Sequence, residues 1–193
     1  MVEAVLLSII VAVFRGGQIK RLGQLHIRKS WLVFVPGLLV ASLWLSRIHG
    51  LEWVSNLTLP VHVVAYAMVV ALVTLNRRLP GMLIIGLGMA LNFAVMAANG
   101  GKMPVSYGAA KSVGMQRQLE RDASAIRHAR VDETTKLWYL ADVIPTPRPP
   151  FPLTGVISVG DIVLSAGLFW LIQWATCPGT GRRREFAADA DAG

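Results

Sequence analysis

Five long apolar runs constrain the fold of this chain more than any other feature. A helix in water must turn a polar face to solvent, whereas a helix in lipid satisfies its own backbone hydrogen bonds and can be apolar on every side. The sequence therefore predicts an all-α integral membrane protein with about five transmembrane helices. The runs are Val2 to Phe14, Trp31 to about Ile48, Leu57 to Leu75, Leu79 to Ala98 and about Val156 to Cys177.

The composition agrees with a membrane protein and argues against a soluble nucleic-acid binder. Charged residues make up 16% of the chain, against about 25% in soluble domains. A net charge of +8 could attract nucleic acid, but the sequence contains no motif that reads nucleic acid. Basic residues at helix ends fix orientation and contact anionic lipid. We therefore expect the lipid bilayer as a partner, and no nucleic acid.

The distribution of basic residues predicts an orientation in the plasma membrane. Basic residues gather in residues 15–29, at Arg77 and Arg78, and at 182–184, whereas the loop between the second and third runs is nearly neutral. Short basic loops stay in the cytoplasm. We therefore expect the N-terminus outside, the C-terminus in the cytoplasm, and the 57 residues of 99–155 outside.

The outer loop has an internal pattern of its own. Apolar residues at helical spacing among charged ones predict an amphipathic helix at roughly 109–130, and a proline-rich run follows at 145–152. The expected organisation is a four-helix transmembrane region at 1–98, an extracytoplasmic loop at 99–155, a fifth transmembrane helix at 156–178 and a disordered cytoplasmic tail at 179–193.

Two carboxylates are candidate catalytic groups, because both are expected near the outer membrane surface. Asp142 precedes the proline run, and Asp161 lies at the head of the fifth run. If they face each other, repulsion and low dielectric raise one pKa, so that one acid donates a proton and the other acts as a base. A structural alternative stays open for each. Ser158 and Asp161 have the spacing of a capping box, and Asp142 could pair with Arg148.

A second candidate cluster follows the fourth run. Asn99, Gly100 and Lys102 could orient a polar or anionic head group. The alternative is a helix C-terminus with a left-handed glycine and a basic residue near the dipole. Within the fourth run, Asn92 predicts an interhelical hydrogen bond. The chain has one cysteine, Cys177, and no metal-ligand spacing or nucleotide motif, so we expect no metal and no cofactor.

Three phrases of the sequence resemble a bacterial membrane family. They read NGGKMPVS at 99–106, LADVIP at 140–145 and ISVGDI at 157–162, in this order after several helices. The family that they resemble is domain of unknown function 5317, and the resemblance covers most of the chain. It implies a bacterial plasma-membrane protein and supplies no known activity.

The aspartate motifs also resemble, more locally, the prolipoprotein signal peptidase family (signal peptidase II). That family carries its catalytic aspartates in a Val-Asp-Phe-Ile-like motif and in a Phe-Asn-x-Ala-Asp motif that opens its last helix. The resemblance implies a catalytic dyad of Asp142 and Asp161. In this chain Ser158 stands where that family has Asn, Gly160 stands where it has Ala, and the family's Gly-Asn-x-x-Asp-Arg motif is missing.

Three functional hypotheses follow from these patterns. The first is an enzyme at the outer membrane interface, in which Asp142 and Asp161 hydrolyse a lipid-linked or membrane-embedded substrate and Asn99, Gly100, Lys102 and Ser158 orient it. The second is a non-enzymatic accessory or scaffold subunit that docks on a membrane protein partner through the outer loop. The third is a small-solute carrier, which the scarcity of charge within the apolar runs disfavours.

Overall fold

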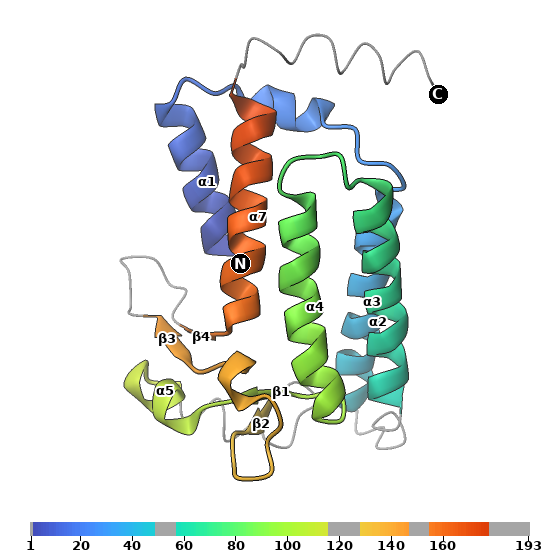
Figure 1. The fold of residues 1–193 in the computed structure, drawn as a ribbon, viewed down its shortest axis with the longest axis vertical. Helices are drawn as coiled ribbons and strands as arrows, with labels where there is room; N and C mark the ends of the chain where they lie inside the picture. Colours follow the sequence, from blue (N-terminus) through green and yellow to red (C-terminus); the bar gives the residue numbers. More distant parts are fainter. Residues whose placement is uncertain (1, 49–56, 116–127, 147–154, 178–193) are drawn as a thin grey trace.

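The five apolar runs form five helices that stand side by side in the computed structural model (Figure 1). The structure describes residues 2–48, 57–115, 128–146 and 155–177. The prediction of helices in these runs is confirmed. The helices are α1 (Val2–Phe14), α2 (Trp31–Ile48), α3 (Thr58–Leu75), α4 (Met82–Ala98) and α7 (Val159–Thr176).

Helix α7 is the last in sequence but lies between the first helix, α1, and the fourth, α4. It packs against α4 on one side and α1 on the other, and α4 in turn packs against α3, which packs against α2 (Figure 1). The segment that follows the outer loop is therefore inserted between two helices that precede the loop. Residues at the head of α7 meet both α4 and the loop.

Helix lengths by themselves support one membrane span and do not support five. Among the described helices, only α7 is both long and apolar enough to cross a bilayer. Helix α1 has 13 residues and is about 20 Å long, shorter than the hydrocarbon core of about 30 Å. The apolar parts of α2, α3 and α4 also fall short of a full span.

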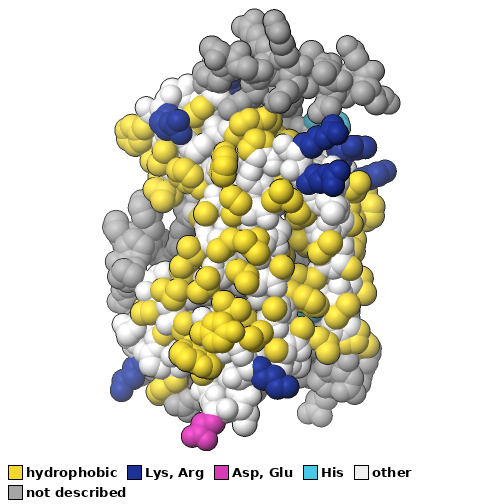
Figure 2. Space-filling view, in the orientation of Figure 1, with side chains coloured by type: hydrophobic (Ala, Val, Ile, Leu, Met, Phe, Trp, Pro, Cys, Tyr) yellow, Lys and Arg dark blue, Asp and Glu magenta, His cyan; other side chains and the backbone are white. Residues whose placement is uncertain are grey.

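The surface of the bundle is apolar around its middle. Large hydrophobic side chains point outward, with Phe14 88% and Phe34 and Leu38 each 68% exposed. On the face in Figure 2, Lys and Arg side chains lie toward the two ends of the molecule, and hydrophobic side chains cover the region between them. Soluble monomers rarely expose continuous apolar patches of more than a few hundred Å².

One end of the bundle collects the basic segments. The short helix η1 (Ile19–Gln24) follows α1, and the backbone N–H of Gln18 donates to the carbonyl of Thr176 at the end of α7 (2.9 Å). The side chain of Asn76, at the end of α3, accepts from the N–H of Arg28 (2.8 Å) and donates to its carbonyl (3.0 Å). Residues 15–29 and the turn after α3 therefore share this end.

The opposite end is formed by the loop between α4 and α7 (Figure 1). The prediction of an all-α chain is incomplete here, because the described residues include short strands in two pairs. Met103–Val105 (β1) runs parallel to His128–Arg130 (β2), and Ile144–Thr146 (β3) runs antiparallel to Gly155–Ile157 (β4). A short helix, Trp138–Leu140 (η3), lies between β2 and β3.

The predicted amphipathic helix at 109–130 is wrong in extent. Helix α5 (Tyr107–Ser112) ends early, because Gly114 adopts a left-handed conformation (φ 77°). The N–H of Met115 then donates to the carbonyl of Ala110 (2.8 Å), a bond typical of a glycine-terminated helix. Residues 116–127 lie outside the described residues, as do Arg148, most of the proline-rich run and the tail.

Helices α4 and α7 approach each other through glycine. A Cβ atom on Gly88 would lie 2.5 Å from the backbone nitrogen of Leu164 and 2.6 Å from the carbonyl oxygen of Gly160, and a Cβ on Gly167 would lie 2.7 Å from the backbone nitrogen of Ile85. Only hydrogen atoms fit between backbones at this distance, as in other small-residue helix contacts. We call the four glycines of this contact the glycine seam: Gly81, Gly88, Gly160 and Gly167.

Candidate functional site

The head of α7 is fixed by the capping box that the sequence predicts. Ser158 precedes the first helical turn, and its Oγ accepts a hydrogen bond from the backbone N–H of Asp161 (3.0 Å). The Asp161 Oδ2 atom accepts from the backbone N–H of Ser158 (3.2 Å). Such a pair satisfies two amide groups that the helix cannot satisfy itself. The capping prediction is confirmed, and it leaves the second carboxylate oxygen of Asp161 free for another helix.

Asn92 of α4 supplies that second contact. Its Nδ2 donates to Asp161 Oδ1 (2.9 Å), and its Oδ1 accepts from the Ser158 hydroxyl (2.9 Å). Ser158 is fully buried. A Cβ at Gly160 would collide with Asn92 Oδ1, so the seam glycine makes room for this contact. Asn92, Ser158 and Asp161 form one polar cluster, and the interhelical bond predicted for Asn92 is confirmed.

Asp142 is buried in the loop on the same end of the bundle. Its backbone N–H donates to the carbonyl of Pro104 (3.0 Å), and its carbonyl accepts from the N–H of Ser106 (2.9 Å). These bonds fix the backbone at position 142 between two segments of the loop. The side chain is 7% exposed, which is unusual for a carboxylate.

The pairing of β3 with β4 leads the chain from Asp142 back to the head of α7. Ile144, two residues after Asp142, pairs with Ile157, which directly precedes the cap residue Ser158. The segments that carry the two carboxylates therefore leave the same end of this short ladder, one from each strand. Burial, and to a lesser extent the negative charge of Asp161, raise the pKa of Asp142 to about 7.

This arrangement gives the two acids different chemical environments. Asp161 accepts hydrogen bonds at both oxygens, from Asn92 and from the Ser158 backbone. Asp142, with its raised pKa, carries a proton in a substantial fraction of molecules near neutral pH. Unequal carboxyl groups of this kind can divide the roles of acid and base between them.

Asn99 and Gly100 form the end of α4. Asn99 Nδ2 donates to the carbonyls of Val95 (2.8 Å) and Lys136 (2.9 Å), and its Oδ1 accepts from the Lys136 N–H (3.1 Å). Gly100 is left-handed (φ 68°) and exposed. This is the geometry of the structural alternative, a glycine-terminated helix. Lys102, two residues after Gly100, is half-buried.

A second polar cluster joins α1 to the other end of α7, and sequence reasoning missed it. Gln173 Nε2 donates to the carbonyl of Ser8 (2.6 Å), and Arg15 donates to Gln173 Oε1 (3.1 Å). Gln173 and Ser8 are buried. The signal in the sequence was a glutamine within an apolar run. Among the described residues, no three His, Cys, Asp or Glu side chains lie close enough together to hold a metal ion.

Comparison with known proteins places the site inside a shared region. The model of a family described as "Family of unknown function (DUF5317)" matches residues 24–173, a range that contains Asn92, Asp142 and Asp161. An uncharacterized protein of Thermotoga maritima is 27% identical over 169 residues, which cover 88% of each chain. No solved structure gives a significant match.

Proposed function

The chain belongs to DUF5317, a family of unknown function, and we propose that it is a multi-pass plasma-membrane protein with an acid–base pair at the outer interface. Asp142 and Asp161 form that pair, and its substrate is lipid-linked or membrane-embedded. The observation that carries the proposal is the β3–β4 ladder, because it returns Asp142 to the head of α7, where the charge of Asp161 acts on it.

The membrane setting is supported by the apolar surface of the bundle and by the charges at its ends. The basic segments gather at one end of the helices and the loop with Asp142 at the other (Figures 1 and 2). The positive-inside rule supports an orientation with the loop outside and the turn at Arg77 in the cytoplasm. A bundle of short helices spans by burying its ends in the interface and thinning the bilayer locally.

The chemistry of the pair is hydrolysis by general acid–base catalysis. Asp161, held by Asn92 and Ser158, takes a proton from a water molecule whose oxygen attacks the carbonyl or phosphoryl centre of the substrate. The bond from that centre to the leaving group breaks, and Asp142 gives its proton to the leaving group. Proton return from Asp161 to Asp142 through water restores the pair.

A heavy-oxygen experiment tests this proposal with a mixture of membrane components as the source of substrate. The purified full chain is reconstituted with a total bacterial membrane extract in water labelled with oxygen-18, and products are analysed by mass spectrometry. Hydrolysis puts one labelled oxygen into a product. We expect labelling with the wild type and with Glu133→Gln, an exposed loop carboxylate, and none with Asp142→Asn or Asp161→Asn. Equal labelling by all four proteins would refute the pair.

A labelling experiment tests the topology separately. In a Cys177→Ser background, Glu133→Cys should react in intact cells with a maleimide that cannot cross the membrane, and Arg78→Cys should react after lysis alone. Both positions are exposed in the structure, so access is decided by the membrane. Reaction of Arg78→Cys in intact cells, with protection of Glu133→Cys, would reverse the proposed orientation.

One observation favours docking on a partner as a second candidate function. Trp138 and Tyr139 of the loop are 57% and 55% exposed, and their rings lie edge to face. Exposed aromatic side chains are enriched in protein interfaces. Pull-down from mild detergent with the wild type and with a Trp138→Ala/Tyr139→Ala variant tests this role. A partner that both proteins retain equally does not dock there.

A further inference from the structure

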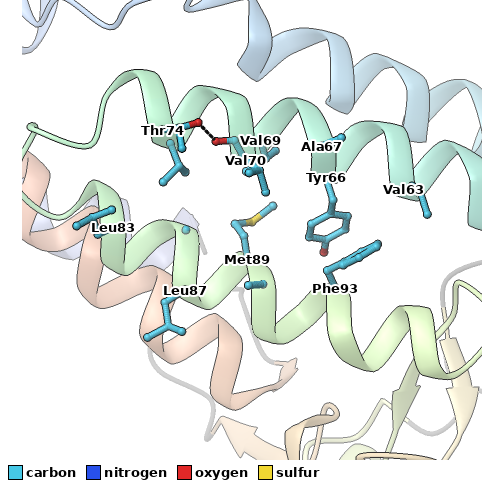
Figure 3. Close-up of a pocket in the computed structure, with 13 residues that line it drawn as sticks. Val63, Tyr66, Ala67, Val69, Val70, Thr74, Leu83, Leu87, Met89 and Phe93 are labelled. Atoms are coloured by element: carbon cyan, nitrogen blue, oxygen red, sulfur yellow. Dashed lines mark hydrogen bonds between the residues drawn. The ribbon is translucent and has the colours of Figure 1, made fainter.

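A groove of 590 Å³ runs along the outside of the bundle between α3 and α4 (Figure 3). Tyr66 and Phe93 lie against each other toward one end of it, and Thr74 and Leu83 lie at the other end. Three small residues lie in the lining of the groove, along the contact of the two helices. These residues are Ala67, Gly86 and Ala90.

The lining of the groove offers hydrocarbon and almost no free polar atoms. The Thr74 hydroxyl donates to the carbonyl of Val70 in its own helix (2.5 Å; Figure 3), and the Tyr66 hydroxyl donates to Met96 Sδ (3.8 Å). Leu83 and Leu87 on the rim are 63% and 55% exposed. An apolar occupant would cover these side chains without leaving a hydrogen-bonding group unsatisfied.

The dimensions of the groove match a single acyl chain. Its volume lies within the range of small-molecule sites, about 300–1,000 Å³. It extends from Val63 to Thr74 along α3, a length of about 16 Å at 1.5 Å per residue. One leaflet of a bilayer contributes about half of a hydrocarbon core of about 30 Å. A chain that enters the groove from one leaflet would therefore fill its length.

The end of the groove at Thr74 and Leu83 opens beside a group of basic side chains. Arg77 and Arg78 follow α3 directly, and Asn76 binds the backbone of Arg28, the neighbour of Lys29, against the same turn. All four basic side chains are exposed. Figure 2 shows Lys and Arg side chains gathered over this end of α3. The surface is therefore apolar along the groove and positive at its mouth.

We propose that this groove binds an anionic phospholipid, with one acyl chain between α3 and α4 and the phosphate at Arg77 and Arg78. The lipid belongs to the leaflet on the basic side, opposite the loop. The inference depends on the membrane setting proposed above and is independent of the carboxylate pair. Basic pockets between membrane helices on the cytoplasmic side are suited to anionic head groups.

Native mass spectrometry of the full chain in micelles tests this assignment. Palmitoyl-oleoyl phosphatidylglycerol and phosphatidylcholine, which share their acyl chains, are titrated separately. We expect the wild type to prefer phosphatidylglycerol. Arg77→Gln/Arg78→Gln should lower its affinity about 25-fold, about fivefold for each charge removed, which corresponds to about 1 kcal/mol per basic residue. Affinity for phosphatidylcholine should stay unchanged, because its head group is neutral overall.

Matched variants separate the groove from general effects. Ala90→Trp fills the groove and should abolish binding of both lipids, whereas Ala94→Trp, at an exposed alanine outside the lining, should bind as the wild type does. Lys20→Gln/Arg21→Gln removes the same charge from the same end and should keep the preference. The proposal is overturned if the two charge variants behave alike or if Ala90→Trp binds lipid normally. A changed oligomeric state in Ala90→Trp with normal lipid binding would instead make the groove a helix-docking face.

Two results keep this inference apart from the proposed function. Asp142→Asn and Asp161→Asn should retain the lipid preference, because neither residue lines the groove. A protein that fails to float with membranes in a density gradient would refute the membrane setting, and with it the lipid site. Normal flotation with no lipid preference would refute the lipid site alone.

Discussion

Helix α4 packs against its two neighbours in opposite ways. Toward α7, the glycine seam brings backbone against backbone, and a Cβ on Gly88 would lie 2.5 Å from the Leu164 nitrogen. Toward α3, Gly86 and Ala90 face the groove of 590 Å³. Small residues occur on both sides, yet the α7 side is closed by backbone along the seam, whereas the α3 side opens into the groove beside the contact of Gly86 with Val73. The difference depends on the partner, because α7 places its own glycines opposite those of α4, whereas α3 places Val73 there.

The comparison also separates two kinds of chemistry. The closed side fixes Asn92 against Ser158 and Asp161 and so gives a carboxylate a defined position. The open side keeps its few hydroxyl groups within the protein and presents hydrocarbon to the surroundings. A reaction needs groups held in place, whereas an acyl chain needs only apolar surface. We therefore expect the two sides to respond very differently to substitution.

The largest expected effect comes from one substitution made on each side. Gly88→Leu forces a side chain against the backbone of α7 and should destabilise the fold by about 5 kcal/mol or more, so that little folded protein is recovered. Gly86→Leu would place its Cβ 2.8 Å from Cγ1 of Val73, and because a side chain can shift more easily than backbone we expect a smaller loss of about 1–3 kcal/mol. Thermal unfolding in micelles measures both. Equal losses would remove the distinction between the two sides.

The next largest effect is a pH dependence at the polar end of the closed side. Burial and the charge of Asp161 raise the pKa of Asp142 from 3.8 to about 7. Between these values the folded protein keeps a proton that the unfolded chain releases, so the free energy of unfolding falls as pH rises, by up to about 4 kcal/mol. Below and above this window the contribution is constant. Unfolding of wild type and Asp142→Asn from pH 4 to 8 measures it, and identical slopes would contradict the burial of Asp142.

A smaller effect is expected when polar groups are removed from the two sides. Asn92→Leu leaves the buried Ser158 hydroxyl and Asp161 Oδ1 without their partner and should cost about 1–3 kcal/mol. Thr74→Val removes a hydroxyl that bonds to its own helix and should change stability by less than about 0.5 kcal/mol. Denaturant titration in micelles compares them. A neutral Asn92→Leu would show that the polar cluster contributes nothing to the contact.

The smallest expected change in the free energy of unfolding comes from filling the groove on the open side. Ala90→Trp should leave the free energy of unfolding within about 0.5 kcal/mol of the wild type, because the indole occupies existing space. Ala94→Trp serves as its control on the exposed part of the same helix. Thermal unfolding of the two variants is the measurement. A loss in Ala90→Trp alone would mean that the groove is too narrow for an occupant of this size.

Local features of the fold were predictable from the sequence. The apolar runs became helices because a helix satisfies the backbone hydrogen bonds of an apolar run within the run itself. The capping box of Ser158 and Asp161 and the glycine end of α4 at Gly100 are encoded within a few residues. By the same logic, the predicted helix at 109–130 failed on one local detail, the left-handed turn at Gly114.

Contacts between distant segments were not predictable. The β3–β4 ladder that links Asp142 to the head of α7 joins short strands whose residues carry no periodic pattern. The position of Asn92 in an apolar run predicted a polar contact. It did not predict the partner, Asp161, which lies 69 residues further along the chain. The groove depends on which glycines of α4 meet glycines of α7, and this is a property of the packed bundle. Sequence reasoning therefore named the carboxylates without their surroundings.

Infrared titration of the Asp142 carboxyl group tests the pairing with Asp161 most directly. The carbonyl stretch of protonated Asp142, identified by its loss in Asp142→Asn, is followed in wild type and in Asp161→Asn. We predict titration near pH 7 in the wild type and a lower pKa in Asp161→Asn, where burial still acts but the neighbouring charge is gone. An unchanged pKa in Asp161→Asn would show that the two acids do not interact and would contradict the proposed site.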